Sequence, residues 1–281
     1  MMSQDIAAGD TPDGAEATVT IDMPAARKIG EYEVLRELGR GGFGVVYEAR
    51  HLHRGDRVAL KTLPTILDGQ PESSRDAERL HRFRREFRSL AEINHPNLAG
   101  MQTLEVDCKQ WFFTMDLVEG VDFLDYVRPG GKLDEQRLRS SLQQLVRGIV
   151  ALHEQRILHR DLKPSNVLVS QDGRLSILDF GLAAELQQAA DQTASMQSRH
   201  FAGTPRYAAP EQAFGERSGA MDWYALGTML YEALLGEAPY RGTASELLIR
   251  KQNEDAPALT SRDDLPQDLA TLVDQLLRRK P

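Results

Sequence analysis

The segment from His159 to Asp179 constrains this chain more than any other part of its sequence. It begins with HRDLKPSN, in which Asp161, Lys163 and Asn166 place a carboxylate, an amine and an amide close together. The following residues, VLVSQDGRLSIL, predict two short apolar strands around an Asp-Gly turn. Such a hairpin would return Asp179 to the side of Asn166, so that one cation could touch both side chains.

These residue types suit the transfer of a phosphoryl group. Asp161 can accept a proton or orient a hydroxyl, and Lys163 can neutralise a phosphate. Asn166 and Asp179 offer oxygen ligands to a hard cation. For HRD taken alone, the alternative is a chance polar loop, but the order and spacing of all four side chains, with apolar strands between them, argue against it.

The composition indicates a globular, disulfide-free protein. The chain has 281 residues, of which 41% are hydrophobic and 27% are charged, enough for one large domain or two small ones. The net charge of −8 argues against a general nucleic-acid-binding protein, but not against a nucleotide ligand in a local basic pocket. The single cysteine, Cys108, fits a reducing compartment, so we expect a cytoplasmic domain.

The two ends of the chain give weaker indications. Residues 1–30 lack apolar periodicity, and we expect a disordered leader. Thr18 and Thr20 could be phosphorylated and bind a phosphothreonine-binding partner, with a plain solvated leader as the alternative. The sequence shows no signal peptide and no apolar run of about 18 residues that would predict a transmembrane helix. The sequence up to residue 281 does not decide whether a membrane anchor follows.

A glycine-rich run lies between predicted strands near the start of the ordered chain. It reads Gly39-Arg40-Gly41-Gly42-Phe43-Gly44. The residues after it, VVYEARHL and RVALKTL, are rich in β-formers. In a dinucleotide-binding fold the same pattern would open a crossover helix, and none follows here. Glycines in a turn between strands let the backbone approach phosphates and leave its N–H groups facing them.

Lys61 lies in the apolar strand VALK and needs an explanation. A strand lysine can extend outward to solvent, or it can turn into a cleft and hold phosphates if an acidic group orients it. Residues 75–93 carry apolar residues at helical spacing and predict an amphipathic helix. Glu86 lies at the middle of this helix and is the carboxylate best placed for Lys61, with an exposed helix charge as the alternative.

Taken together, these motifs resemble those of the protein kinase family. They occur in the order glycine loop, VALK, helix glutamate, HRDLKPSN, DFG, GTPRYAAPE and DWYALG, over residues 32–281. The resemblance implies a two-lobed α+β fold, with an N-lobe at about 31–116 made of an antiparallel sheet plus one helix. A larger, mainly helical C-lobe would occupy about 120–281. Lys163 and Thr204 favour serine/threonine specificity, and the style of the motifs resembles the bacterial, eukaryotic-like kinases.

The resemblance implies that ATP lies between the lobes and that its γ-phosphoryl goes to a protein Ser or Thr, including those of the chain itself. The glycine loop would cover the phosphates, and Lys61, oriented by Glu86, would hold two of them. Asn166 and Asp179 would hold Mg²⁺, with Mn²⁺ as a substitute. The remaining nucleotide contacts would come from the cleft and from the hinge between the lobes. Val46 and Met115 would pack at the adenine, only the backbone of Asp116 and Val118 would hydrogen-bond it, and Asp122 would reach the ribose. Ala59 and Leu168 would complete the nucleotide site.

The same resemblance assigns the rest of the reaction centre. Asp161 would position the acceptor hydroxyl and take its proton, while Lys163 stabilises the transferring group. Thr204 would hydrogen-bond both, and Asp222 would anchor the backbone of the catalytic loop. His159 is expected to pack and hydrogen-bond rather than act as a base.

Two further expectations concern regulation and extent. Arg160 could dock a phosphorylated activation segment, for which Thr193, Ser195 and Ser198 are candidate phosphosites. The usual arginine partner of Glu211 is missing before residue 281, so we expect the C-lobe to be truncated before its last helix.

Other functions are compatible with single motifs. A pseudokinase scaffold that signals by contact would have lost a catalytic Asp, a Lys or a metal ligand, and none is lost here. Metabolite kinases of the same fold generally lack a segment such as GTPRYAAPE, which shapes a peptide site. The sequence therefore predicts a protein serine/threonine kinase.

Overall fold

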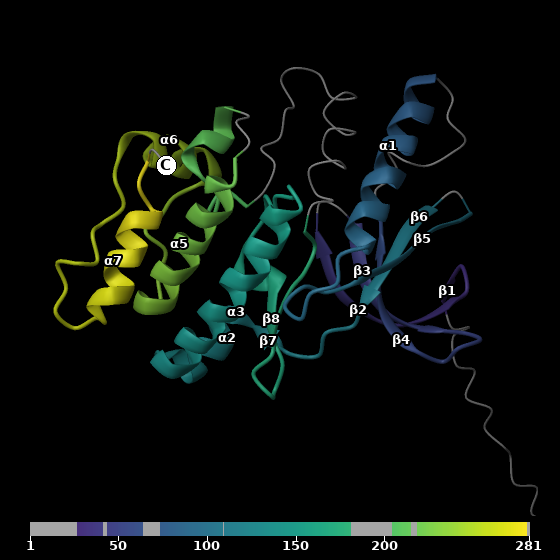
Figure 1. Cartoon of the computed structure of the whole chain (residues 1–281), viewed down its shortest axis with the longest axis horizontal. Coiled ribbons are helices and arrows are strands. Elements are labelled where there is room, and N and C mark those ends of the chain that lie inside the picture. Colours follow the sequence, from purple (N-terminus) through teal and green to yellow (C-terminus); the bar gives the residue numbers. More distant parts are fainter. Residues whose placement is uncertain are drawn as a thin grey trace, which may run out of the picture.

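A computed structural model of the chain describes residues 27–41, 44–63, 74–108, 110–180, 204–214 and 218–279. It has two lobes, with an antiparallel sheet and α1 (Ser74–Ala91) on one side and most of the helices on the other (Figure 1). The predicted two-lobed α+β architecture is thereby confirmed. None of the described helices is long and apolar enough to cross a membrane.

The N-lobe sheet is antiparallel throughout, with the strand order β1-β2-β3-β4-β6-β5. Its strands are β1 (Lys28–Ile29), β2 (Tyr32–Gly41), β3 (Gly44–His51), β4 (Arg57–Thr62), β5 (Met101–Asp107) and β6 (Gln110–Asp116). Strand β1 lies within the predicted leader. Ile29 is only 6% exposed and packs in the apolar cluster of the sheet, so the expectation of a disordered leader up to residue 30 is wrong for β1.

The two faces of this sheet carry different apolar clusters, because successive side chains of a strand alternate between faces. One cluster gathers Tyr32, Tyr47 and Phe112 with their neighbours. The opposite face packs against α1, where the rings of Phe87 and Phe113 lie 5.8 Å apart. The predicted amphipathic helix is therefore confirmed, and its apolar stripe holds it on the sheet.

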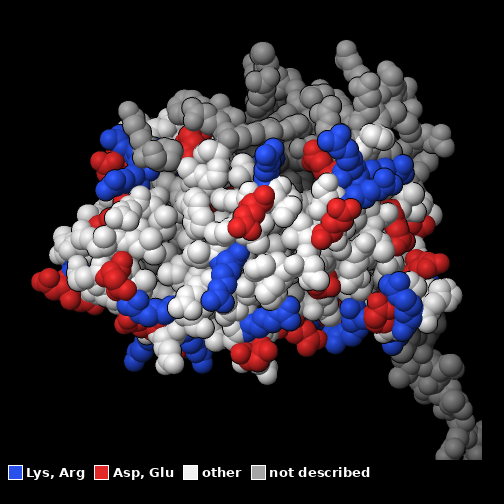
Figure 2. Space-filling view, in the orientation of Figure 1, with Lys and Arg blue, Asp and Glu red and all other residues white. Residues whose placement is uncertain are grey.

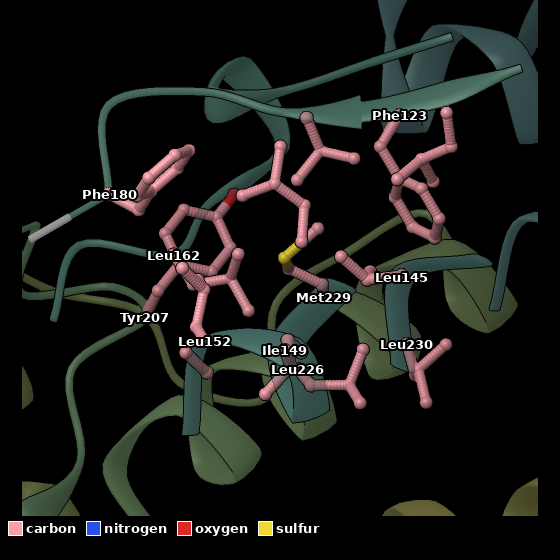
Figure 3. Close-up of a cluster of buried hydrophobic side chains, with 14 of the residues drawn as sticks. Phe123, Leu145, Ile149, Leu152, Leu162, Phe180, Tyr207, Leu226, Met229 and Leu230 are labelled. Carbon is pink, nitrogen blue, oxygen red and sulfur yellow. The ribbon is translucent and has the colours of Figure 1, made fainter. Parts of the chain in front are cut away.

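The C-lobe is built around α3 (Glu135–Glu154) and α5 (Ala220–Leu235), which carry much of the core drawn in Figure 3. Leu145 and Ile149 of α3 are fully buried, each contributing about 2 kcal/mol of apolar burial. Around them lie α2 (Phe123–Val127), α6 (Ala244–Asn253), α7 (Gln267–Leu276) and short 3₁₀ turns at Pro129–Gly131, Pro164–Asn166 and Pro210–Phe214.

Local signals begin and end these helices. Asp134 caps α3 by accepting a hydrogen bond from the N–H of Arg137, and Thr243 forms a capping box with Glu246 at the start of α6. Helix α5 ends at Gly236, whose φ of 79° is left-handed. On the face drawn in Figure 2, basic and acidic side chains are interspersed.

Candidate active site

The segment that follows the HRD motif forms the predicted hairpin. Strands β8 (Val167–Val169) and β9 (Leu175–Ile177) pair in antiparallel register, with Val167 opposite Ile177. The N–H of Leu178 then donates to the carbonyl of Asn166 at 2.8 Å. The hairpin therefore returns Asp179 to the side of Asn166, as its sequence predicts.

The carboxylate of Asp161 is the centre of a hydrogen-bond cluster. The Lys163 ammonium donates to its Oδ2 at 2.7 Å. The backbone N–H and the hydroxyl of Thr204 both donate to its Oδ1, each at 3.1 Å. Lys163 also donates to the Thr204 hydroxyl at 3.3 Å. The predicted contacts of Thr204 are thus confirmed, and they hold one carboxylate, one amine and one hydroxyl at a single point.

Asp222, at the start of α5, holds the backbone of the catalytic loop at His159 and Arg160. It is 1% exposed and accepts hydrogen bonds from the N–H groups of His159 and Arg160, both at 2.9 Å, and from His153 Nε2 at 2.8 Å. Burial alone would raise the pKa of this carboxyl, but the hydrogen bond from His153, the nearby His159 ring and the two backbone bonds outweigh burial and lower the pKa. The predicted anchoring role is confirmed.

His159 connects the catalytic loop with the end of the hairpin. Its ring is fully buried; Nε2 donates to the carbonyl of Leu178 at 3.0 Å, and Nδ1 accepts from the N–H of Asp161 at 3.3 Å. Both ring nitrogens are used structurally, so the prediction that His159 packs and hydrogen-bonds, rather than acting as a base, is confirmed.

Asp179 lies in an uncommon backbone conformation at the edge of the cleft. Its φ is 56°, which costs a residue other than glycine about 1 kcal/mol or more. Its Oδ2 accepts from the Lys61 ammonium at 2.7 Å. Lys61 therefore turns into the cleft rather than outward. The ammonium contact in the structure is to Asp179, so the predicted pairing of Lys61 with Glu86 stays a prediction.

The side chains of Asp179 and Asn166 fit a hard cation. Asp179 Oδ1 is buried and has no hydrogen-bond partner among the described residues. The amide nitrogen of Asn166 donates to the carbonyl of Asp161 at 2.9 Å, which leaves its amide oxygen as a ligand. An unsatisfied buried carboxylate oxygen is costly unless a ligand completes it, and Mg²⁺ prefers one or two such oxygens together with phosphate oxygens.

The glycine-rich loop requires glycine at Gly44 and leaves open space beside two of its other glycines. Gly44 has φ 120°, and a Cβ there would lie 1.8 Å from the carbonyl oxygen of Thr62, so only glycine fits. At Gly39 and Gly41 a Cβ would meet nothing within 4 Å. The space beside these two is open and suits a close approach by phosphates. Gly42 and Phe43 lie outside the described residues. Arg40 is paired with Glu37 at 2.7 Å.

The predicted walls of the nucleotide cleft come together on one face of the N-lobe sheet. Val46 lies opposite Lys61 in the β3–β4 register, and Ala59 lies opposite Met115 in the β4–β6 register. Directly paired residues project to the same face, so these apolar side chains line the face that carries the Lys61 ammonium. From the C-lobe, Leu168 is half-buried between two buried valines.

The connection between the lobes shows contacts that the sequence did not indicate. The Asp116 carboxylate accepts from the N–H of Gly100 at 2.9 Å and from Gln102 Nε2 at 3.0 Å. The N–H of Asp116 is itself bound to the carbonyl of Gly100, so the adenine contact predicted for this backbone is limited to the carbonyl. Val118 is half-buried in the same connection.

Asp122, the predicted ribose contact, caps α2. Its Oδ1 accepts from the N–H of Asp125 at 3.0 Å, at the point where β7 (Val121–Asp122) pairs with β8. Asp122 lies opposite Leu168 in that pairing, which brings it to the predicted nucleotide cleft. Its contact with a ribose stays a prediction.

Sequence analysis also missed two residues that hold the segment after Thr204. The Gln212 side chain accepts from the N–H of Ala209 at 2.8 Å and donates to the carbonyl of Arg160 at 3.1 Å, so it ties this segment to the catalytic loop. Lys251 of α6 is fully buried and donates to three backbone carbonyls of the segment. Neither residue belongs to a recognisable motif.

Some predictions fall outside the described residues. These are the candidate phosphosites Thr193, Ser195 and Ser198, and the leader threonines Thr18 and Thr20. The docking role of Arg160 depends on the first group and stays a prediction.

The comparison with known proteins agrees with this geometry. Residues 32–281 match the model of the protein kinase domain. The serine/threonine-protein kinase PknA of Mycobacterium tuberculosis is 33% identical over 258 residues, which cover 90% of this chain and 57% of PknA. The serine/threonine-protein kinase PrkC of Bacillus subtilis is 30% identical over 255 residues, which cover 90% of this chain and 38% of PrkC. The chain thus spans 57% of the length of PknA and 38% of that of PrkC, less than two thirds of either relative.

Solved structures show the same relationship. The crystal structure of Rad53 1-466 in complex with AMP-PNP superimposes with a TM-score of 0.70 at 26% identity, covering 89% of this chain and 61% of that one. The ordered motifs, the cluster around Asp161 and these matches have one explanation: the chain belongs to the protein kinase family, as a serine/threonine kinase domain of the bacterial, eukaryotic-like type.

Proposed function

We propose that this domain uses ATP with Mg²⁺ to phosphorylate serine and threonine side chains of proteins, including its own. The observation that carries the proposal is the cluster in which Lys163 and Thr204 both hydrogen-bond the carboxylate of Asp161. That cluster fixes the carboxylate beside the position that an acceptor hydroxyl would occupy. The same position is within reach of an amine that can neutralise a phosphate.

In the proposed reaction, the acceptor hydroxyl donates a hydrogen bond to Asp161. The hydroxyl oxygen attacks the γ-phosphorus, the bond from that phosphorus to the β–γ bridging oxygen breaks, and ADP leaves. Asp161 takes the hydroxyl proton. Lys163 stabilises negative charge on the phosphoryl group as it moves, and its contact with Thr204 keeps the ammonium in place.

The nucleotide would be held by residues that the structure already orients. Lys61 is held in the cleft by Asp179, where it can bind phosphate oxygens. The open space at Gly39 and Gly41 accommodates phosphates under the loop. The Rad53 structure contains AMP-PNP, a nucleotide analogue, which supports the same use of the cleft here.

Asn166 and Asp179 would hold the metal ion, as the unpartnered Asp179 Oδ1 favours. Bound there, Mg²⁺ would neutralise phosphate charge and fix the geometry of the triphosphate. Mn²⁺ could substitute because it accepts the same oxygen ligands.

Metal dependence provides the test of this assignment. We expect transfer of labelled γ-phosphate to a Ser/Thr peptide to require Mg²⁺ and to stop on addition of a chelator. Asp179→Asn should raise the Mg²⁺ concentration for half-maximal activity by about tenfold or more, since it removes a charged ligand. Asp172→Asn, in the exposed hairpin turn, is the matched control. Equal Mg²⁺ dependence of both variants would refute the metal assignment.

We further propose that the catalytic domain is cytoplasmic and that a phosphothreonine-binding protein docks on the leader at Thr18 or Thr20. The single thiol, Cys108, is exposed and unpaired, which suits a reducing compartment. A leader peptide carrying phosphate on Thr18 and Thr20 should bind a phosphothreonine-binding module in a titration, whereas equal binding of the unphosphorylated peptide would count against docking. Protease protection of the domain in intact cells tests the location.

A further inference from the structure

Lys251 is a buried charge for which the reaction described above has no use. Lys251 lies near the end of α6. Helix α6 lies on the side of the C-lobe away from the N-lobe sheet (Figure 1). The residue exposure of Lys251 is zero, although lysine is rarely buried without a partner. A group that is so costly to bury marks a place where its hydrogen bonds matter.

The partners of Lys251 are main-chain oxygens. Its ammonium donates to the carbonyls of Pro205 at 2.9 Å, Arg206 at 2.7 Å and Ala208 at 2.8 Å, which uses all three of its N–H donors. It also lies 5.2 Å from the ring centroid of Tyr224, a cation–π distance. Burial lowers the pKa of Lys251 to about 7, and the three carbonyl oxygens favour its charged form.

The segment that Lys251 holds begins at the reaction centre. Thr204 hydrogen-bonds Asp161, and the next residues form a tight turn in which the N–H groups of Tyr207 and Ala208 return to the carbonyl of Thr204. The turn therefore starts at the carboxylate that an acceptor hydroxyl would reach, and a peptide carrying that hydroxyl would lie beside the turn.

Other contacts hold the side chains of the turn, but only Lys251 among the described side chains binds its carbonyls at several points. The Tyr207 hydroxyl donates to Glu232 at 2.7 Å, and Arg206 lies 3.5 Å from the other oxygen of Glu232. These contacts come from α5. Lys251 connects the turn to α6 instead, through the backbone itself.

We propose that Lys251 is a positioning residue for the protein substrate: by binding three carbonyls of residues 205–208, it sets the shape of the surface on which the peptide beside the acceptor hydroxyl lies. This inference rests on the proposed transfer to proteins. It places a determinant of peptide binding in α6, and it distinguishes peptide binding from nucleotide binding, because none of the contacts of Lys251 reaches the ATP cleft.

The test measures the steady-state kinetics of Lys251→Met, in which the side chain keeps most of its length and loses its donors. We expect KM for a Ser/Thr peptide to rise by about tenfold or more, with KM for ATP within about twofold of the wild-type value. Lys132→Met is the matched control, since Lys132 is exposed in the loop before α3. Lys251→Gln keeps two N–H donors and should recover part of the peptide affinity.

Each outcome decides something different. A merely structural role would lower the active fraction, and hence the maximal rate, while leaving both KM values unchanged; that result would overturn the inference. If Lys251→Met does not fold, the peptide-to-ATP KM ratio of Lys251→Gln is used in its place, and an unchanged ratio overturns the inference equally. A wild-type protein and Lys132→Met variant that both fail to phosphorylate any peptide would refute the proposed function instead.

Discussion

Replacing Asp222 by asparagine tests how the catalytic loop is held. The carboxylate accepts three hydrogen bonds inside the core: its Oδ2 binds His153 and the N–H of His159, and its Oδ1 binds the N–H of Arg160. Asparagine keeps one acceptor oxygen. If that oxygen takes the Oδ2 position, the amide NH₂ faces the N–H of Arg160, and two donors oppose each other.

The cost of Asp222→Asn can be estimated from these contacts. Losing one hydrogen bond to a buried charge and leaving a donor unsatisfied costs about 3 kcal/mol. In a domain of this size, that corresponds to a fall in Tm of roughly 6–12 °C. Because the loop carries Asp161, kcat should also fall by about tenfold or more. ATP affinity should stay unchanged, since Asp222 lies behind the loop and not in the cleft.

The pH dependence of this effect has a defined sign. The pKa of Asp222 is lowered in the folded protein, so its stabilising contribution is present above the ordinary carboxyl value of 3.8 and is lost as the pH falls below it. The difference in free energy of unfolding between wild type and Asp222→Asn should therefore be constant from about pH 8 to pH 5 and shrink below about pH 4.

Urea unfolding at several pH values measures this difference. Asp255→Asn is the control, because its side chain is 76% exposed and its pair with Arg279 should contribute less than about 1 kcal/mol. If Asp222→Asn were as stable as this control, or if its deficit grew at acidic pH, the anchoring argument would be wrong.

The remaining predictions address the loop, the core and the lysine. Gly44→Ala should lose ATP affinity and about 2 kcal/mol or more of stability, because its Cβ would meet a backbone carbonyl. Gly39→Ala should stay within about 1 kcal/mol of the wild-type stability, since its Cβ has open space. Thermal unfolding measures both variants. Ile149→Ala should cost about 2–5 kcal/mol in urea unfolding without changing KM for ATP, and a smaller cost would show a collapsible core. Glu86→Gln should lower activity less than Lys61→Met in transfer assays; the reverse order would assign the larger role to the glutamate.

The reaction centre could be predicted from the sequence because its residues are close along the chain. The hairpin between Asn166 and Asp179 follows from apolar strands around an Asp-Gly turn, and the structure confirms it. The amphipathic helix predicted over residues 75–93 follows from helical periodicity. The roles of Thr204 and Asp222 came from resemblance, since each lies more than forty residues from its partner.

The contacts that could not be predicted involve main-chain atoms. Lys251 binds three main-chain carbonyls, and because every residue has a carbonyl, the sequence does not indicate which ones a side chain binds. A helical lysine is ordinarily exposed, so periodicity places it on the surface. Asp116 was expected to matter only through its backbone, and its carboxylate instead holds Gly100. The small strand β1 was not predicted, because two residues are too few to show a periodic pattern.

The most direct test of the central claim is transfer of labelled γ-phosphate from ATP with Mg²⁺ to a Ser/Thr peptide, with Asp161→Asn measured beside the wild-type protein. The account predicts label on Ser or Thr with the wild type, loss of transfer by about a hundredfold or more in Asp161→Asn, and ATP binding retained in both. Transfer by Asp161→Asn at the wild-type rate would contradict the assignment of Asp161 and of the cluster around it.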